Sequence, residues 1–268
     1  MRSSQPSTCC TNNPPMQRLM MIDSHCHLDF PRFDSDRHEV IERARIAGVD
    51  VIINSGVDYK TNLSTLALAD KYEHIHATLG LGPGVATSKS DEDIRRILSQ
   101  IEQNIENAVG VGEAGLDRFH CKTESGRARQ MEVFKKVIEI AETVDKPLVI
   151  HGRDAEYEAL QLVRHLDNVV FHCYGGSLET MNQITDAGYH VSIATLVCFS
   201  KHHQSLVKHL PLERMIIETD SPYLSPRKGR NEPAFLADSV ATIAKLRGME
   251  EADVAQVTAQ NTRRVFGL

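Results

Sequence analysis

The sequence has no tryptophan, and aromatic residues make up only 5% of its 268 positions. Aliphatic side chains must therefore fill most of the core, and a hydrophobic content of 41% is ordinary for a soluble globular protein. No apolar stretch approaches the roughly 20 residues that a membrane-spanning helix needs. We therefore expect no membrane segment.

The cysteines also lack a pattern. The six cysteines show no paired zinc-finger spacing, and no secretory signal accompanies them. Cys26 lies between two candidate metal ligands and Cys173 directly follows another, and neither position suits a structural disulfide. The simplest interpretation is a reducing compartment, so we expect a cytoplasmic protein.

The chain also has no excess of positive charge, because its formal net charge is −6. Nucleic-acid-binding faces are usually basic, so a broad face of that kind is not expected. A nucleic acid held at a small site stays compatible with the sequence, because bound divalent cations would change the local sign of the charge.

The first 20 residues differ from the rest of the chain. They are polar, lack periodicity and contain no apolar h-region, so they are not a secretory signal. We interpret residues 1–20 as a disordered leader, or as a mis-assigned start with translation beginning at Met20 or Met21. Residues 21–268 form one hydrolase domain in our prediction.

From Met21 onward, short apolar runs alternate with helical patterns. Runs such as 49–56 and 75–82 read as buried strands, and segments such as 36–48 and 91–107 carry helical periodicity. The count is about eight β–α units, which predicts a single (β/α)8 TIM barrel. A doubly wound open sheet is the competing architecture, and it would gather ligands near one crevice.

Six metal-type side chains fall where predicted strands end, on the first, fourth, fifth, sixth and eighth strands. Only a closed barrel brings the first and eighth strands side by side, so this distribution favours the barrel, with a metal site at the carboxyl ends of its strands. The six are His25, His27, Glu113, His151, His172 and Asp220.

Each candidate also has a plainer interpretation. His25 and His27 point the same way from a strand, but such a pair alone is a weak signal. Glu113 can bridge two cations or cap the following helix, and Asp220 can ligate a metal or cap a helix before Ser221–Pro222. His151 and His172 end two consecutive units, which makes coincidence a poorer explanation.

Several separated motifs then carry a resemblance. In the segments IDSHCHLDF, VGEAGLDRF, KPLVIHGRDA, VVFHCYGGS and IIETDSPYLSP, the chain resembles the TatD family of metal-dependent deoxyribonucleases, among the amidohydrolase-like barrels. The resemblance runs from Ile22 to Leu268. It implies DNA cut from an end, 3′ to 5′, with single-stranded or frayed ends as the substrate.

The same resemblance implies the roles of the six residues. His25, His27, Glu113 and Asp220 surround one metal, and Glu113, His151 and His172 surround a second, with Glu113 as the bridge. Related barrels use a carboxylated lysine as this bridge, so Glu113 favours TatD-like enzymes. Gly82 is a departure, because relatives often carry a histidine there, near the substrate phosphate.

These residues lead to a hypothesis of two-metal phosphodiester hydrolysis. Two divalent ions are expected, Mg²⁺ or Mn²⁺ in use with Zn²⁺ as the alternative. Asp220 and Glu113 are the catalytic candidates, with Asp220 deprotonating the water. Arg153 is the expected substrate contact, because loops after strands form the active face of a barrel.

Two other functions stay open at this point. One is an amidohydrolase-type enzyme for a small amide, lactone or phosphoester, which Gly82 favours. The other is a non-catalytic binding module that keeps a structural metal. Structural sites are usually closed with four ligands, so six ligand-type residues fit an open catalytic site better.

Overall fold

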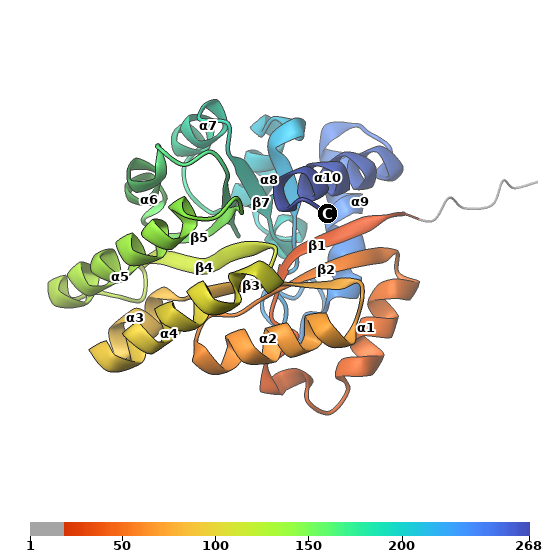
Figure 1. The fold of residues 1–268 in the computed structure, drawn as a ribbon. Coiled ribbons are helices and arrows are strands. Elements are labelled where there is room, and N and C mark those ends of the chain that lie inside the picture. Colours follow the sequence, from red (N-terminus) through yellow and green to blue (C-terminus); the bar gives the residue numbers. More distant parts are fainter. Residues whose placement is uncertain (1–18) are drawn as a thin grey trace, which may run out of the picture.

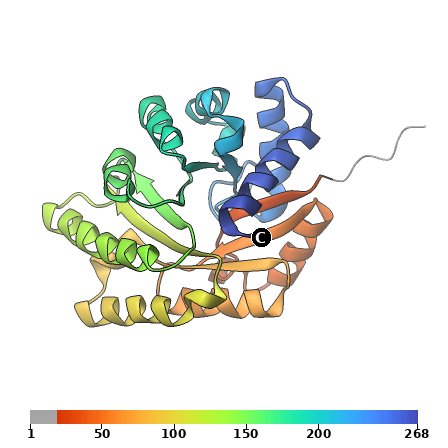
Figure 2. The same cartoon turned by 45° about the horizontal axis from the view of Figure 1, so that its top comes forward.

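The computed structural model describes residues 19–268 of the chain. The leader predicted for residues 1–20 falls almost wholly outside the described residues and stays a prediction. Within the described part, helices surround a central ring of strands (Figure 1). The C-terminus lies near the start of β1, which Figure 2 shows from a second direction.

Eight parallel strands form one sheet in the order β1 to β8. The barrel closes at the carboxyl ends, where the amide of Asp220 donates to the carbonyl of His25 (3.0 Å) and the amide of His27 donates to the carbonyl of Ser221 (2.8 Å). This confirms the predicted (β/α)8 barrel over the open sheet. The strands are β1 (Met21–Cys26), β2 (Val49–Ser55), β3 (Ile75–Leu81), β4 (Gly110–Asp117), β5 (Leu148–Arg153), β6 (Val169–His172), β7 (His190–Ile193) and β8 (Met215–Ile217).

Helices connect the strands and cover the outside of the barrel (Figure 1). Most lie where the periodicity predicts them, but α3 was not predicted; it begins with Pro83, a residue suited to the first turn of a helix. The helices are α1 (Arg37–Ile46), α2 (Tyr59–Lys71), α3 (Pro83–Ser88), α4 (Asp91–Asn104), α5 (Glu124–Glu142), α6 (Glu156–Val163), α7 (Leu178–Asp186), α8 (Lys201–His209), α9 (Leu236–Arg247) and α10 (Glu251–Phe266).

Polar caps set where several of these helices begin. Asp58 accepts a hydrogen bond from the amide of Thr61, whose side chain bonds back to the Asp58 backbone, a capping box that starts α2. Side chains cap α4, α5, α7 and α8 in a similar way, and they are Ser90, Thr123, Ser177 and Ser200. Ser90 follows α3, and each of the other caps lies at the end of a segment that follows a strand, on the face where the candidate ligands lie.

The interior of the barrel has its own small core. Ile53, Val149, Val170 and Ile216 come from four strands, and Val265 and Phe266 at the end of α10 pack against them. Residues two apart on a strand point to the same side. His151, His172 and Glu218 stand two residues beyond Val149, Val170 and Ile216, so they face the interior above this apolar floor.

Two sequence expectations concern the rest of the chain. Among residues 19–268, no helix is long and apolar enough to cross a bilayer. The described cysteines are free thiols, which agrees with the positions judged unsuited to a disulfide, whereas Cys9 and Cys10 lie outside the described residues.

Candidate metal centre

One group of candidate ligands lies where β1 meets the end of β8. Nε2 of His25 and Nε2 of His27 are 3.3 Å apart, and they lie 3.3 and 3.6 Å from Oε2 of Glu113. Oδ1 of Asp220 lies 3.6 Å from His27 Nε2 and 4.0 Å from His25 Nε2. The four side chains converge on a space that suits one cation.

A second group lies where β4, β5 and β6 meet. Oε1 of Glu113 is 2.8 Å from Nδ1 of His151 and 3.3 Å from Nε2 of His172. Those two nitrogens are 3.2 Å apart. The rings of His25 and His172 stack at 4.1 Å, so the two groups are neighbours, and each oxygen of Glu113 faces one group.

The position of Glu113 differs from the sequence expectation. It lies inside β4, which continues to Asp117, rather than at its carboxyl end. Gly112 and Gly115 flank it with positive φ angles of 126° and 150°, and a Cβ atom there would collide with the carbonyl oxygens of Val149 and His151 on β5. The glycines therefore let the two backbones approach, which brings Glu113 against His151.

Contacts on the far side of each imidazole decide which nitrogen faces the centre. Nδ1 of His27 lies 2.9 Å from the carbonyl of Ser55, and Nδ1 of His25 lies 3.1 Å from the Ser55 hydroxyl. A ring nitrogen that donates its proton outward leaves the other nitrogen free as a ligand. Both rings therefore present Nε2 to Glu113.

The two remaining histidines are held by acidic residues that the sequence analysis did not select. Asp117 Oδ2 lies 3.4 Å from Nε2 of His151, and Glu218 Oε1 lies 3.4 Å from Nδ1 of His172. The predicted strand eight ran through Asp220, and on it Glu218 stands two residues before Asp220, which was the signal for Glu218. In the structure β8 ends at Ile217 and Asp220 has a φ of 52°, so Asp220 lies in the loop beyond the strand. Asp117 had no comparable signal, because β4 was expected to end at Glu113.

The charges of the metal-free cluster are strongly coupled. Burial would raise the pKa of Glu113, but the charge on His172 and hydrogen bonds from His151, His172 and His25 hold it well below its usual range. Burial would lower the pKa of His27, but its hydrogen bond with Asp220 and the charge on Glu113 raise it to about 9. The pKa values of His151 and His172 are raised against burial as well, by their acidic partners.

The raised pKa values favour the protonated forms of His27, His151 and His172, which balance the buried carboxylates when no cation is bound. The fit to a metal rests on two observations. Imidazole and carboxylate groups are the ligands of Zn²⁺, and carboxylates also suit Mg²⁺ and Mn²⁺. Glu218 is fully buried, and neither of its carboxylate oxygens meets hydrogen-bond geometry with the residues that the structure describes; its ion-pair contact is with Nδ1 of His172 at 3.4 Å. A buried carboxylate without hydrogen bonds of good geometry is costly, and a nearby cation reduces that cost. His25, His172 and Glu218 also form a possible ligand group of their own.

The predicted substrate contact, Arg153, ends β5 and is exposed to solvent. Its guanidinium lies 4.1 Å from the centre of the Phe119 ring. Two basic residues of the loop after β8 are paired with acidic side chains, Arg227 with Asp238 and Arg230 with Asp36. Those two guanidinium groups are thus engaged within the protein, whereas Arg153 makes no ion pair among the residues that the structure describes.

Known proteins resemble this chain along nearly its whole described length. A family profile described as TatD related DNase matches residues 22–267. A Methanocaldococcus jannaschii protein named an uncharacterized metal-dependent hydrolase is 39% identical over 94% of this chain and 98% of its own length. The 3′-5′ ssDNA/RNA exonuclease TatD of Pectobacterium atrosepticum is 31% identical over 92% of this chain and 100% of its own.

Solved structures show the same architecture. The crystal structure of the TatD homologue YjjV of Escherichia coli superimposes with a TM-score of 0.85 and 29% identity, covering 92% of this chain and 98% of that one. The profile match and the relatives above 30% identity agree with the barrel and with the grouped ligand-type side chains. The chain belongs to the TatD related DNase family and is a metal-dependent hydrolase.

Proposed function

We propose that this protein hydrolyses phosphodiester bonds of DNA as a 3′–5′ exonuclease with a dinuclear metal centre. The observation that carries the proposal is the placement of Glu113, whose two oxygens face two different groups of ligand-type nitrogens. A carboxylate in that position suits a bridge between two cations. The relative from Pectobacterium atrosepticum named as an exonuclease supports the choice of substrate.

His25, His27 and Asp220 would hold one ion with Glu113, and His151 and His172 would hold the other. Mg²⁺ or Mn²⁺ is expected, with Zn²⁺ as the alternative, and such ions activate water and neutralise charge on a transferring phosphate. The hydrolase domain in this proposal comprises residues 21–268. A cytoplasmic location, expected from the cysteines, belongs to the same proposal.

Asp220 orients the attacking water and accepts its proton. Burial would raise the pKa of this carboxyl, but the hydrogen bond with His27 and the charges of the histidines lower it, so it is ionised at neutral pH. The water oxygen forms a bond to phosphorus as one ester P–O bond breaks, and the leaving oxygen takes up a proton from solvent. Arg153, at the end of β5, contacts the phosphate chain.

The test is a metal-reconstituted assay on single-stranded DNA, RNA and small esters, with Glu113→Ala as the blank. Asp220→Asn should keep bound metal and lose about 10²- to 10⁴-fold in kcat, the usual contribution of a general base. Unchanged turnover with metal still bound would contradict the role of Asp220. Loss of metal from Glu113→Ala at both positions, measured by elemental analysis, would support the bridge.

A small-molecule amidohydrolase is the second candidate, and Gly82 is the observation that favours it. Gly82 has no side chain that could reach toward a substrate phosphate. A Cβ atom built at this position would meet Val57, at 3.4 Å. Turnover of a lactone or amide, together with no release of mononucleotides under any of the metals, would establish this alternative and overturn the nuclease.

A further inference from the structure

The exposed aromatic residues of this chain are not scattered. Among residues 19–268, four phenylalanine and tyrosine side chains are exposed, namely Phe119, Tyr157, Phe199 and Tyr223. All four follow the carboxyl end of a strand: β4, β5, β7 and β8 respectively. A protein with few aromatics thus presents several of them on the face that carries the candidate metal centre.

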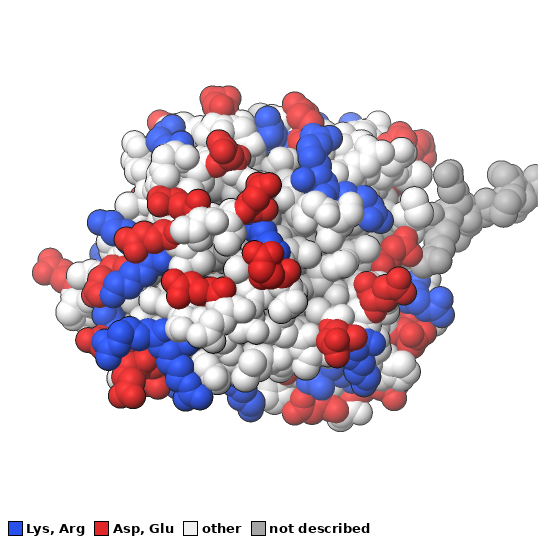
Figure 3. Space-filling view, viewed as in Figure 1, with Lys and Arg blue, Asp and Glu red and all other residues white. Residues whose placement is uncertain are grey.

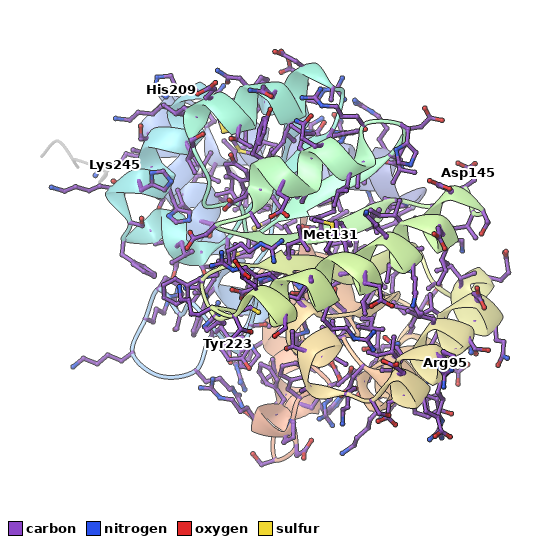
Figure 4. All side chains as sticks on the ribbon, turned by 90° about the vertical axis from the view of Figure 1, so that its left-hand side faces the viewer. Arg95, Met131, Asp145, His209, Tyr223 and Lys245 are labelled. Carbon is purple, nitrogen blue, oxygen red and sulfur yellow. The ribbon has the colours of Figure 1, made fainter. Side chains whose placement is uncertain are left out.

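One of these rings connects to the β1 side of the centre. The ring of Phe30 stacks on that of His27 at 4.6 Å, and Tyr223 meets Phe30 edge-on at 6.3 Å. The guanidinium of Arg32 lies 5.9 Å from the Tyr223 ring. We call Phe30, Arg32 and Tyr223 the tyrosine platform. Figure 4 labels Tyr223 beside the light-blue loop that follows β8.

A similar set connects to the β5 side. Asp117, which contacts His151, also accepts a hydrogen bond from Nδ1 of His120 at 2.7 Å, and the His120 ring meets Phe119 at 4.9 Å. Phe119 is 47% exposed although Arg153 lies over its ring. Lys122 lies 5.2 Å from the same ring. We call Phe119, Lys122 and Arg153 the phenylalanine platform.

The two platforms lie on opposite sides of the barrel mouth. The strands follow one another in order around the ring, so β1 and β8 lie across from β4 and β5. The candidate metal centre lies between the platforms, with His27 on one side and His151 on the other. Each platform combines an aromatic face with one or two cations.

Such a combination fits nucleotides. Every base has a π-face that stacks on aromatic rings or on guanidinium planes, and neighbouring cations contact the phosphates. The net charge of −6 gives no overall attraction for a polyanion, and on the face shown in Figure 3 acidic and basic side chains are interspersed. Paired bases in a duplex do not offer their faces, so the platforms suit unpaired bases.

We propose that the tyrosine and phenylalanine platforms each stack one base of a single-stranded nucleic acid that lies across the mouth, with the scissile phosphate at the metal centre between them. This inference rests on the proposed nuclease function. It adds the residues that hold the substrate, and it explains how an acidic protein binds a polyanion.

The test is a cycle that removes the ring, the base or both. Phe119→Ala and Tyr223→Ala are compared with the unmodified protein on a single-stranded oligonucleotide and on an oligomer of equal length whose residues are all abasic. On the normal oligonucleotide, each substitution should lower kcat/KM by about 5- to 150-fold, the range of stacking on one base. The abasic oligomer has no base to stack, so on it the same substitution should lower kcat/KM by less than about 2-fold.

Phe199→Ala and Tyr157→Ala are matched controls. These rings are 55% and 53% exposed, and neither has a ring or cation contact among the residues that the structure describes. They should leave kcat/KM unchanged on both substrates. Phe119→Leu keeps apolar bulk without a π-face and should behave as Phe119→Ala, whereas Phe119→Tyr should retain activity.

Equal losses on both substrates, or no loss on either, would overturn the stacking role. An effect confined to binding of a protein or peptide partner would overturn it as well. Failure of the proposed function has a different signature: the unmodified protein would then hydrolyse neither oligomer, nor a simple phosphodiester such as bis(p-nitrophenyl) phosphate, under any of the metals tested.

Discussion

Asp117 and His151 form the contact that sets the orientation of the second ligand group: Oδ2 of Asp117 lies 3.4 Å from Nε2 of His151, while Nδ1 of the same ring lies 2.8 Å from Glu113. The proton on Nε2 therefore points to Asp117, and Nδ1 is left for a metal. Carboxylates that hold a ligand histidine in this way are often needed for full metal affinity.

We predict that Asp117→Ala weakens metal binding at one site by about 10- to 100-fold, the usual effect of losing such a partner. Asp117→Asn, which keeps an acceptor oxygen, should recover part of the affinity. Titration with Mn²⁺ followed by calorimetry measures the change. His120→Ala is the control, because His120 shares Asp117 but is not a candidate ligand; equal affinity in Asp117→Ala and the unmodified protein would contradict the role of Asp117.

The metal-free protein should lose stability as the pH rises from about 6.5 to about 9. The pKa of His27 is raised in the folded state to about 9, so its protonation stabilises the fold below its ordinary value near 6.5, and this stabilisation disappears as the pH passes 9. Asp23 acts in the same direction, because burial raises the pKa of its carboxyl to about 8 despite hydrogen bonds from Thr219.

Thermal unfolding in the presence of a chelator measures this effect. A change of 1 kcal/mol moves Tm by roughly 2–4 °C in a chain of this size. Saturating metal should reduce the slope of Tm against pH, because the metal replaces the protons on the histidines. Calorimetry in two buffers should detect the proton release on metal binding. A Tm that rises between pH 6.5 and 9 without metal would contradict the assignment. His27→Gln should flatten the profile.

The loop after β8 is tied to α1 by a bidentate ion pair, in which Arg43 donates to both oxygens of Glu232 at 2.9 and 2.7 Å. Glu232 is only 7% exposed, so Arg43→Ala leaves a nearly buried carboxylate without its partner. We predict a loss of about 1–3 kcal/mol in the free energy of unfolding. Lys136→Ala, which breaks an exposed pair with Glu132, should cost less than about 0.5 kcal/mol in the same urea titration.

Phe266 is 5% exposed and packs with Val265 against the strand residues inside the barrel. We predict that Phe266→Ala lowers the free energy of unfolding by about 3–5 kcal/mol, the cost of emptying a buried aromatic site. Phe199→Ala, at a position 55% exposed, should change it by less than about 0.5 kcal/mol. Similar values for the two variants would show that the packing of Phe266 is not needed for stability.

The barrel could be predicted because its signals are local and repeated. Each strand run is bounded by a helical pattern, and His151 and His172 recur at equivalent places in consecutive units. The ligand-type residues come from strands one to eight, so they can meet only if the barrel closes. The backbone hydrogen bonds of Asp220 and His27 across the β1–β8 boundary close it.

Other features depend on register and on partners distant in sequence. The continuation of β4 past Glu113 requires the close approach to β5 that Gly115 permits, and no local pattern shows this. The ion pair of Arg230 with Asp36 joins residues far apart in sequence, so no local pattern shows that this loop cation has an acidic partner. Glu218, by contrast, could have been selected from the sequence by the two-residue alternation alone.

The packing of Val265 and Phe266 inside the barrel determines by which route substrate enters and product leaves. Within residues 19–268 these side chains and their strand neighbours fill the interior at the amino ends of the strands. No polymer can be threaded through such a barrel from one end to the other. Whatever reaches the metal centre enters at the carboxyl-end mouth and departs by the same route, so each cleaved fragment must clear the site before the next can occupy it.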